Sequence, residues 1–345
     1  MNFSLVSTVF NEINRLDQTI IDLQGQSIQP TEFVIIDAGS NDGTYERLQK
    51  WKSESQFPII ILQEKGCNVA RGRNLAIQAA STDLIVSTDF GCRFDPEWLS
   101  SLLKPFENPE VQVVGGAFKV NEEDVTTLAS RSDYILQRGY RLVMDEHFSV
   151  SSRSIAFRKN VWGKLGGYPE WLTLAADDTI FWKMIKKQGF KYEMVTTPLV
   201  YWGRHHTNKA FAREAYRYGL GDGESRINYR NFWSSFVETT LRYMLFLSLF
   251  LMALKLIFGH FLPEIPIGIY FLPLLFLPGL RSYINAWKSW RIFKSGKYNF
   301  NVFLNALLQL EMSRIQYFKG YIQGLLDWDP IKKEGRKQLW QFLGK

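Results

Sequence analysis

Acidic residues recur just beyond short apolar runs in the N-terminal part of the chain. The four runs are followed by Asn11-Glu12, Asp37, Glu64 and Asp89. A single acid in such a place is more often a helix cap or a turn former. Because these acids recur at equivalent points, a site for a polar ligand is the better interpretation.

Apolar strands and amphipathic helices alternate around these residues. Strands are expected at 3–10, 32–40, 57–64 and 83–89, and helices at 15–27, 42–54 and 68–80. This alternation predicts an α/β fold in which a parallel sheet lies between two layers of helices. Ligands of such sheets bind outside the carboxyl ends of the strands, which is where these polar residues stand.

A second acidic feature, Asp177-Asp178, precedes a segment with apolar residues at helical spacing. One acid is explained by capping and by the helix dipole, but these do not require two. A neighbouring carboxylate raises the proton affinity of an acid, which suits a general base. Glycine-rich dinucleotide fingerprints and Walker loops are absent from the sequence, which argues against dehydrogenases and NTPases.

Several motifs occur in one order between Val6 and Phe190, and together they resemble the family 2 glycosyltransferases of GT-A fold. They are "VSTVFNE", "FVIIDAGSNDGT", "GRNLAI", "STDFGCRFDPEWL" and "SRSIAFRKNVWGKLGGYPEWLTLAADDTIFWKMIKKQGF". The resemblance implies a Rossmann-like α/β/α domain, a UDP- or GDP-sugar donor, a divalent metal and inversion at the anomeric carbon. It also implies that the donor nucleotide is bound by Asn11, Glu12, Asp37, Arg73 and Asp89.

The resemblance further implies a metal site, because a departing nucleoside diphosphate carries negative charge that Mg²⁺ or Mn²⁺ can neutralise. By this resemblance Asp89 opens the family's D-x-D metal motif, but Gly91 replaces the second aspartate. His205 or His206 is a candidate metal ligand, although an adjacent pair in a polar loop is as often solvent-facing. Metal dependence is therefore less secure than for a complete motif.

The acceptor side of the resemblance places the general base at Asp178, with Asp177 as its acidic neighbour. Acceptor-binding residues are expected in the segment that contains Gly166, Gly167, Tyr168 and Trp171. The two glycines permit a tight bend under the acceptor. Trp171 either stacks on a sugar face or is an ordinary surface or core aromatic.

The C-terminal third differs in composition from the rest of the chain. Residues 231–345 hold 14 of the 41 Lys and Arg but only 6 of the 34 Asp and Glu. They also contain two apolar segments, 241–259 and 265–285, and an amphipathic tail at 300–326. The expected division is therefore a catalytic domain at 1–230 and a helical membrane-associated region at 231–345.

The two apolar segments are candidate transmembrane helices, with Arg242 and Lys255 reaching toward the bilayer surface. Basic residues flank both segments, so the positive-inside rule predicts a cell-membrane protein whose catalytic domain faces the cytoplasm. Buried core helices or a monotopic hairpin are the alternatives. The amphipathic tail either lies on the membrane or packs on the catalytic domain. Membrane lipid, rather than nucleic acid, is the expected partner of the basic region.

These observations predict an inverting glycosyltransferase that acts on a hydroxyl of a glycolipid or polysaccharide acceptor. One alternative is a polyprenyl-phosphate sugar synthase, whose acceptor is already an anion and needs no base. The acidic pair Asp177-Asp178 favours the hydroxyl acceptor. A non-catalytic nucleotide-binding relative is the other alternative, which Gly91 suggests and which the presence of Asp37, Asp89 and Asp178 opposes.

Overall fold

The chain folds into two compact units in the computed structural model, which describes residues 1–142, 148–259 and 267–344. The sheet unit comprises Met1–Asp124, Leu142–Arg204 and Leu326–Lys345, and the helical unit comprises Val125–Arg141 and His205–Leu325. This division differs from the expected boundary at residue 230. The helical unit begins at His205, and the C-terminal helix belongs to the sheet unit.

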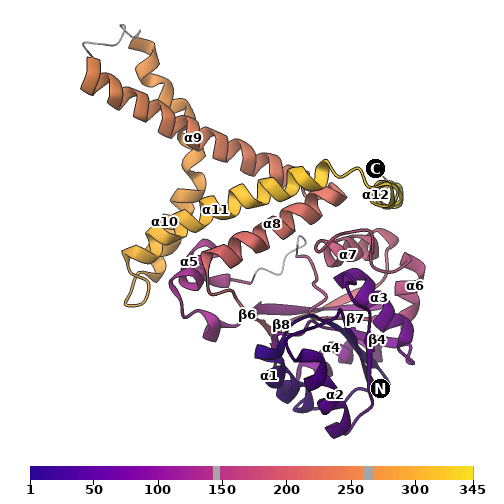
Figure 1. Ribbon diagram of the computed structural model, residues 1–345. Coiled ribbons are helices and arrows are strands. Elements are labelled where there is room, and N and C mark those ends of the chain that lie inside the picture. The colour runs from indigo at the N-terminus through magenta and orange to yellow at the C-terminus, as the bar shows by residue number, and fades with distance from the viewer. Residues whose placement is uncertain (143–147, 260–266, 345) are drawn as a thin grey trace. The chain divides into compact units, whose positions relative to one another are not determined.

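One eight-stranded sheet forms the centre of the sheet unit (Figure 1). Its spatial order is β3-β2-β1-β4-β7-β6-β8-β5. The bounds are β1 Ser4–Val9, β2 Glu32–Asp37, β3 Ile59–Gln63, β4 Leu84–Ser87, β5 Cys92–Phe94, β6 Val113–Val120, β7 Ile155–Arg158 and β8 Tyr192–Trp202.

The strands β3, β2, β1 and β4 are parallel, as the alternating pattern predicts. The sheet continues beyond the four predicted strands, and there it is mixed: β7 runs antiparallel to both β4 and β6, and β5 runs antiparallel to β8. The helix–strand alternation that builds a parallel sheet stops after β4. The result is a mixed sheet whose parallel half carries the ends of β1, β2 and β4 at one edge.

Helices cover both faces of the sheet and complete a three-layer α/β/α unit. Because side chains alternate along a strand, Leu5 and Val6 of β1 enter two different apolar cores. The Leu5 core includes residues of α1 (Ile13–Gln24), α2 (Thr44–Glu54) and α4 (Trp98–Leu103). The Val6 core includes residues of α3 (Val69–Ala79), α6 (Lys159–Leu165) and α7 (Asp177–Gln188). The sheet unit also contains η1 (Lys104–Glu107), η2 (Glu122–Asp124) and α12 (Pro330–Leu343).

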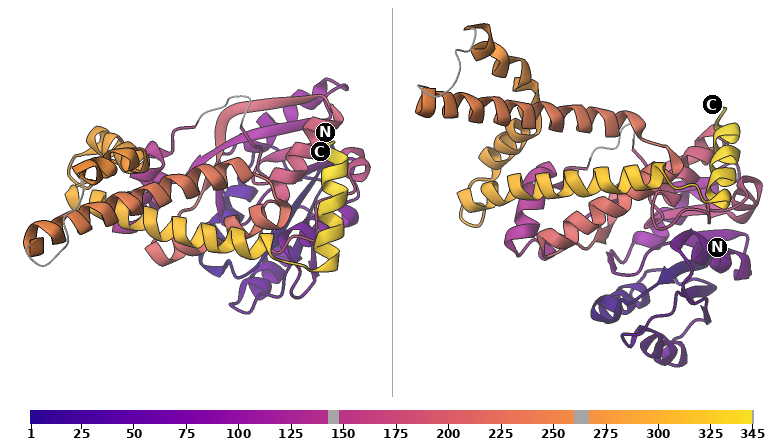
Figure 2. Two further views of the ribbon diagram at one scale, coloured as in Figure 1. Left: turned by 90° about the horizontal axis from the view of Figure 1, so that it is seen from above. Right: turned by 45° about the horizontal axis from the view of Figure 1, so that its top comes forward.

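The helical unit is built around α8 and α11, which lie side by side (Figure 2). Its elements are α5 Leu128–Leu136, η3 Arg138–Tyr140, α8 Asn208–Ser225, α9 Tyr229–Phe258, η5 Ile267–Leu280, α10 Arg281–Phe293 and α11 Phe300–Leu325. Glycines make the crossing of α8 and α11 close. A Cβ atom at Gly219 would lie 2.1 Å from the Tyr317 carbonyl oxygen, and one at Gly320 would lie 2.2 Å from that of Tyr216. Residues 216–223 of α8, with the sequence "YRYGLGDG", therefore have a packing role.

The helix α9 contains the first expected apolar segment, 241–259. Within the described residues it is the one helix whose length and composition suit a membrane span, and it is mostly unburied within the molecule. Its 30 residues measure about 45 Å, against about 30 Å for the hydrocarbon core of a bilayer. Arg242 does not reach toward a surface as expected, because its side chain is fully buried.

The second apolar segment, 265–285, lies partly outside the described residues. From Ile267 to Leu280 it forms a 3₁₀ helix that contains Pro273 and Pro278, and α10 follows. Proline lacks a backbone N–H, so it interrupts a regular α-helix here. Within the described ranges this segment does not supply a second helix suited to a span.

The amphipathic tail forms α11 and packs inside the helical unit. Its small and aromatic face, including Phe303, Ala306 and Tyr321, is buried, and its glycines meet α8. A second apolar stripe on the same helix is exposed and comprises Phe300, Leu304, Leu308, Ile315 and Ile322. The tail thus has both a packed face and an unpartnered apolar face.

Candidate active site

The polar residues that follow β1 and β2 are held by one turn. Asn11 adopts a left-handed conformation, its backbone N–H donates to the hydroxyl of Ser40, and its side-chain oxygen accepts from the N–H of Asn41. The buried carboxylate of Asp37 accepts hydrogen bonds from the N–H groups of Gly39 and Ser40 and from the side chain of Gln63. Asn11 and Asp37 therefore shape the same turn at the edge of the sheet.

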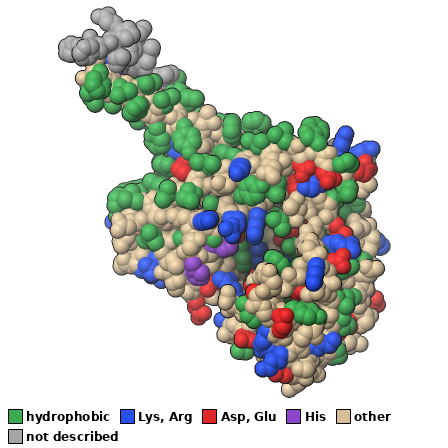
Figure 3. Space-filling model, viewed as in Figure 1, with side chains coloured by type: hydrophobic (Ala, Val, Ile, Leu, Met, Phe, Trp, Pro, Cys, Tyr) green, Lys and Arg blue, Asp and Glu red, His purple; other side chains and the backbone are tan. Residues whose placement is uncertain are grey.

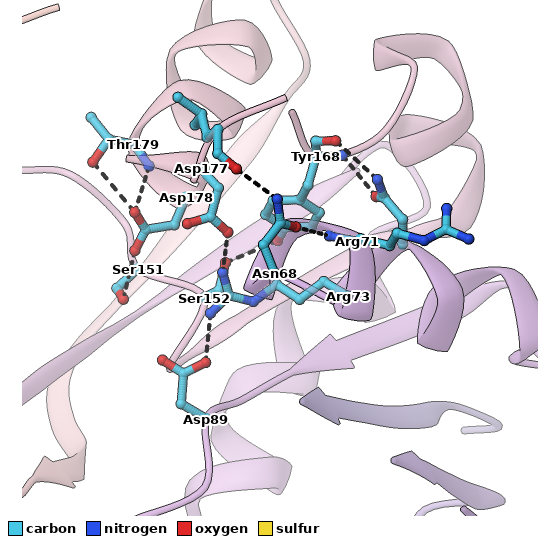
Figure 4. A network of polar contacts seen from close by, with 12 residues as sticks. Asn68, Arg71, Arg73, Asp89, Ser151, Ser152, Tyr168, Asp177, Asp178 and Thr179 are labelled. Carbon is cyan, nitrogen blue, oxygen red and sulfur yellow. Dashed lines mark hydrogen bonds and ion pairs between the residues drawn. The ribbon is translucent and has the colours of Figure 1, made fainter. Parts of the chain in front are cut away.

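A buried arginine joins the end of β4 to the start of α7 (Figure 4). One guanidinium nitrogen of Arg73, on α3, donates to Asp89 at 2.6 Å, and the other donates to Asp177. Desolvation alone would lower the pKa of Arg73, but the carboxylates of Asp177 and Asp89 raise it above its ordinary value. Two regions distant in the sequence, Asp89 and Asp177, are thus held together by a permanently charged side chain.

The three side chains of this bridge differ in their electrostatics. Desolvation favours the neutral form of Asp89, but Arg73 and Arg153 outweigh it and hold the pKa of Asp89 below its usual range. For Asp177, burial raises the pKa to about 6, and Arg73 offsets only part of that increase. Asp89 therefore remains ionised, while Asp177 is buried and engaged by Arg73.

Asp178 is the more accessible acid of the pair. Its Oδ2 accepts a hydrogen bond of 3.0 Å from the hydroxyl of Ser151, and its Oδ1 accepts from the N–H of Thr179 (Figure 4). Unlike the buried Asp177, it is half-buried, and among the described residues no arginine donates a hydrogen bond to it. Of the two acids, Asp178 is therefore the one placed to accept a proton from a ligand.

Arg153 connects the two acidic ends of the site, and sequence reasoning missed it. Its guanidinium donates to the Ser151 hydroxyl at 3.0 Å, and its Nε lies 3.8 Å from Oδ2 of Asp89. Arg153 lies just before β7, and β7 pairs antiparallel with β4, so the start of one strand lies beside the end of the other. Arg153 lies in the sequence segment 151–154, but only the pairing of β7 with β4 shows that it lies beside Asp89.

A side chain from the connection between β1 and α1 occupies the place where a second aspartate would stand. Gly91 has a φ of +82°, and a Cβ atom built on it would lie 2.9 Å from Oε2 of Glu12. The carboxylate of Glu12, which follows β1, thus fills the space that a side chain at residue 91 would take. Burial raises the pKa of Glu12 to about 7; Arg15 opposes this increase and Asp89 adds to it.

The expected acceptor segment lies next to the acidic pair but contains buried as well as accessible residues. Gly166 and Gly167 both have positive φ, and Gly167 lies against the side chain of Asn74. Tyr168 is buried, stacks on Phe181 and exchanges a hydrogen bond of 3.0 Å with Ser152. This segment therefore forms the support of the site through Tyr168.

Trp171 lies against the backbone of α12, where a Cβ atom at Gly335 would be 2.3 Å from its ring. Its indole is half-buried, so one part packs on the C-terminal helix and another part remains accessible. The structure therefore places Trp171 in the sheet unit, where it packs against α12.

The two candidate metal-ligating histidines belong to the helical unit. Nε2 of His205 lies 3.8 Å from Glu214, and its ring meets Phe211 edge to face. His206 is exposed. In the part of the chain that the structure describes, no group of three or more His, Cys, Asp or Glu side chains is arranged to hold a metal ion.

Comparison with known proteins identifies this part of the chain. Residues 4–166 match the family model described as glycosyl transferase family 2. These residues form a family 2 glycosyltransferase domain. The resemblance inferred from the motifs, and the expectation of a glycosyltransferase enzyme, are confirmed.

Proteins similar in sequence to this chain are also named as glycosyltransferases. The chain is 26% identical over 234 residues to the O-antigen chain rhamnosyltransferase RfbN of Salmonella typhimurium. The aligned part covers 63% of this chain and 70% of RfbN. It is 22% identical over 182 residues to the glycosyltransferase AglE of Haloferax volcanii. That alignment covers 50% of this chain and 58% of AglE. The chain thus spans little more than half of AglE.

A solved structure supports the GT-A-like fold. The mannosyltransferase PcManGT of Pyrobaculum calidifontis, solved in complex with GDP-Man and Mn²⁺, matches with a TM-score of 0.52 at 16% identity. The match covers 95% of this chain and 88% of that one. At this identity the likeness shows the fold, so the expected fold class is confirmed.

Proposed function

We propose that this glycosyltransferase transfers a sugar, with inversion, from a UDP- or GDP-sugar to a hydroxyl group of a glycolipid or saccharide acceptor. The observation that carries the proposal is the bridge Asp89–Arg73–Asp177, with the accessible carboxylate of Asp178 beside it. The bridge holds a donor-side carboxylate and an acceptor-side carboxylate in one rigid arrangement. Preorganisation of this kind is what a displacement reaction needs.

The proposed reaction is a single displacement. Asp178 accepts the proton of the acceptor hydroxyl, whose oxygen forms a bond to the anomeric carbon as the bond to the diphosphate oxygen breaks. The electron pair of that bond leaves with the nucleoside diphosphate, and attack from the opposite face inverts the anomeric centre. Arg73 and Ser151 orient the acids, since each donates a hydrogen bond to one of them.

The leaving diphosphate needs positive charge near the end of β4. Arg153 and Arg204 both lie over the ring of Trp202, with the carbon of each guanidinium 4.3 Å from the ring centre, and Arg153 also faces Asp89. Guanidinium groups bind phosphate oxygens in a fixed geometry. These two arginines are therefore the side chains proposed to face the departing diphosphate.

Mg²⁺ or Mn²⁺ is the proposed cofactor. The described residues fit a site that the donor completes, because such ions commonly bind through one or two carboxylates plus phosphate oxygens. Asp89 would supply one hard oxygen ligand, and among the described residues no group of three or more His, Cys, Asp or Glu side chains is arranged to hold the ion without the donor. When bound, the ion would neutralise charge on the diphosphate.

The apolar helix α9 supports attachment to a membrane, with the sheet unit in the cytoplasm as the basic flanks predict. RfbN, by its name, acts on O-antigen chains, which favours a glycolipid or saccharide acceptor here as well. Attachment and sidedness are parts of the proposal that a salt wash and protease accessibility would test.

The deciding experiment for the donor is a thermal-shift screen of nucleotide sugars with the full-length protein, with and without Mn²⁺. GDP-mannose and UDP-sugars are the first donors to test, since the structural neighbour was solved with GDP-Man and Mn²⁺. We expect one nucleotide class to raise the melting temperature, and the Asp89→Asn variant to lose that shift. Equal melting temperatures with every nucleotide sugar would contradict the proposed donor class.

A further inference from the structure

A groove lies between α8 and α11 in the helical unit. It has a volume of about 350 Å³ and is lined by Lys209, Arg213 and Tyr216 from α8 and by Met312, Gln316 and Lys319 from α11. The close glycine crossing of the two helices fixes its walls, because the backbones of α8 and α11 are in contact at Gly219 and Gly320. The groove is therefore a built feature rather than a gap between mobile side chains.

The charges that line this groove are all positive. Lys209, Arg213 and Lys319 are exposed, and none of them forms an ion pair or a hydrogen bond with another residue in the described ranges. The acids of α8 have other partners: Glu214 lies beside His205, and Asp222 accepts from the hydroxyl of Tyr317. The three cations are thus available to an external anion.

An apolar surface borders the groove on α11. Leu308, Ile315 and Ile322 are exposed, and they lie less than a third of a helical turn from the groove-lining face of Met312 and Lys319. Figure 3 shows Lys and Arg side chains gathered where Figure 1 draws α8, with hydrophobic side chains along the neighbouring helices. A ligand that fits both surfaces carries an anionic head and an apolar chain.

We propose that the groove between α8 and α11 binds the phosphate headgroup of an anionic membrane lipid. Charge complementarity favours an anion, and the exposed stripe of α11 favours a lipid over a soluble phosphate. The inference rests on the membrane attachment in the proposed function, and adds to it a specific lipid class and a specific site. Occupation of the groove would hold α8 and α11 at the bilayer surface.

The test uses the full-length protein in a neutral detergent and native mass spectrometry. Phosphatidylglycerol and phosphatidylcholine with the same acyl chains are titrated separately. We expect at least 10-fold tighter binding of phosphatidylglycerol, because each basic residue near a lipid surface contributes about a factor of five. The variant Lys209→Gln/Arg213→Gln/Lys319→Gln should lose this preference.

A matched control removes three positive charges elsewhere. Lys52, Lys104 and Lys164 are exposed residues of the sheet unit, and their triple change to Gln should keep the preference. A second variant, Gln316→Trp, fills the groove without changing its charge and should weaken phosphatidylglycerol binding. An equal loss in the control triple, or full binding by Gln316→Trp, would overturn the site.

Inorganic phosphate separates the two sources of the anion. If 10-fold excess phosphate displaced all bound phosphatidylglycerol, the ligand would be free phosphate and the lipid proposal would be wrong. The groove variants should keep nucleotide-sugar binding and should stay with membranes in high salt, because α9 is unchanged. Loss of lipid preference with intact attachment therefore bears on the groove alone, whereas salt release of the wild-type protein would refute the attachment.

Discussion

The sheet unit and the helical unit distribute charge in opposite ways. In the sheet unit the apolar side chains are buried in two cores, and the acids and arginines of the site gather at the edge of the sheet. In the helical unit Arg242 is fully buried, while Phe250, Leu256 and Ile257 of the same helix are each more than half exposed. A buried charge together with exposed apolar surface is the pattern expected of a helix in lipid, so it agrees with the proposed membrane attachment.

The difference teaches what each buried charge is for. Arg73 is held by two carboxylates that a reaction would use. Arg242 instead lies 2.7 Å from Glu311, donates to the Gly279 carbonyl, and lies over the ring of Tyr283. It thus joins α9, η5, α10 and α11. The first charge holds the two acids of the site together, and the second fastens four elements of the helical unit to one another.

Replacing Arg242 should give the largest effect on stability. Arg242→Met removes a fully buried charge that pairs with the mostly buried acids Glu238 and Glu311, so we expect the free energy of unfolding to fall by about 3–5 kcal/mol. Thermal unfolding of the full-length protein in detergent measures this. The control is Lys191→Met, which breaks the exposed pair with Glu110 in the sheet unit and should cost less than about 1 kcal/mol. Similar losses in both variants would remove the contrast between the units.

Replacing Asp178 should give the largest effect on transfer. Asp178→Asn keeps the size of the side chain but cannot accept the acceptor's proton, so we expect transfer to fall by about 100-fold or more with donor binding retained. The initial rate of nucleoside diphosphate release in the presence of acceptor measures it. Asp83→Asn, at an exposed acid of the same unit, is the control and should leave the rate unchanged. Near-normal turnover by Asp178→Asn would favour the polyprenyl-phosphate acceptor, which needs no base.

The sequence predicted the parallel half of the sheet because β1 to β4 and their helices have clear periodicity. It also grouped the acids at the strand ends and the pair Asp177-Asp178. It could not predict the antiparallel partner β7, and therefore missed Arg153, since strand pairing is a long-range property. Nor could it predict that Arg242 would be buried, because the sequence around an arginine in an apolar segment does not show whether the side chain contacts water or an acid such as Glu311.

The crossing of α8 and α11 can be broken by one methyl group. Gly219→Ala places a Cβ atom 2.1 Å from the carbonyl oxygen of Tyr317, so the helices must separate, and we expect a loss of about 2–3 kcal/mol. Gly163→Ala on α6 is the matched control, because a Cβ atom there meets nothing within 4 Å. Alanine is the better helix former, so the control should be neutral or stabilising by up to about 1 kcal/mol. Thermal unfolding of both variants compares them, and an unchanged melting temperature for Gly219→Ala would mean that the crossing adjusts freely.

The metal should bind in an ordered way if Asp89 is its one carboxylate ligand. We expect little Mn²⁺ affinity in the free protein and at least 10-fold tighter binding once nucleoside diphosphate is present, since the phosphates supply the remaining ligands. Titration calorimetry with and without nucleotide measures both states. Asp89→Ala should abolish the coupling, whereas Gly91→Asp should not restore a second ligand, because its side chain would meet Glu12. Tight Mn²⁺ binding without nucleotide would assign the ion to other ligands, with His205 and His206 the first to test.

The smallest expected effect concerns the carboxyl group of Glu12 and the pH. Its pKa is raised by burial from 4.5 to about 7, so folding favours the neutral acid. The stabilisation is complete below about pH 4.5 and is lost as the pH rises through 7. Glu12→Gln should therefore match the wild type near pH 4.5 and exceed its stability above pH 7, by about 1–2 kcal/mol for this partly buried group. Urea unfolding at pH 5 and pH 8 measures the difference, with the exposed Glu46→Gln as the control that should show none. If Glu12→Gln were instead less stable than the wild type at pH 8, a partner would stabilise the ionised Glu12 in the folded protein, which would contradict the raised pKa.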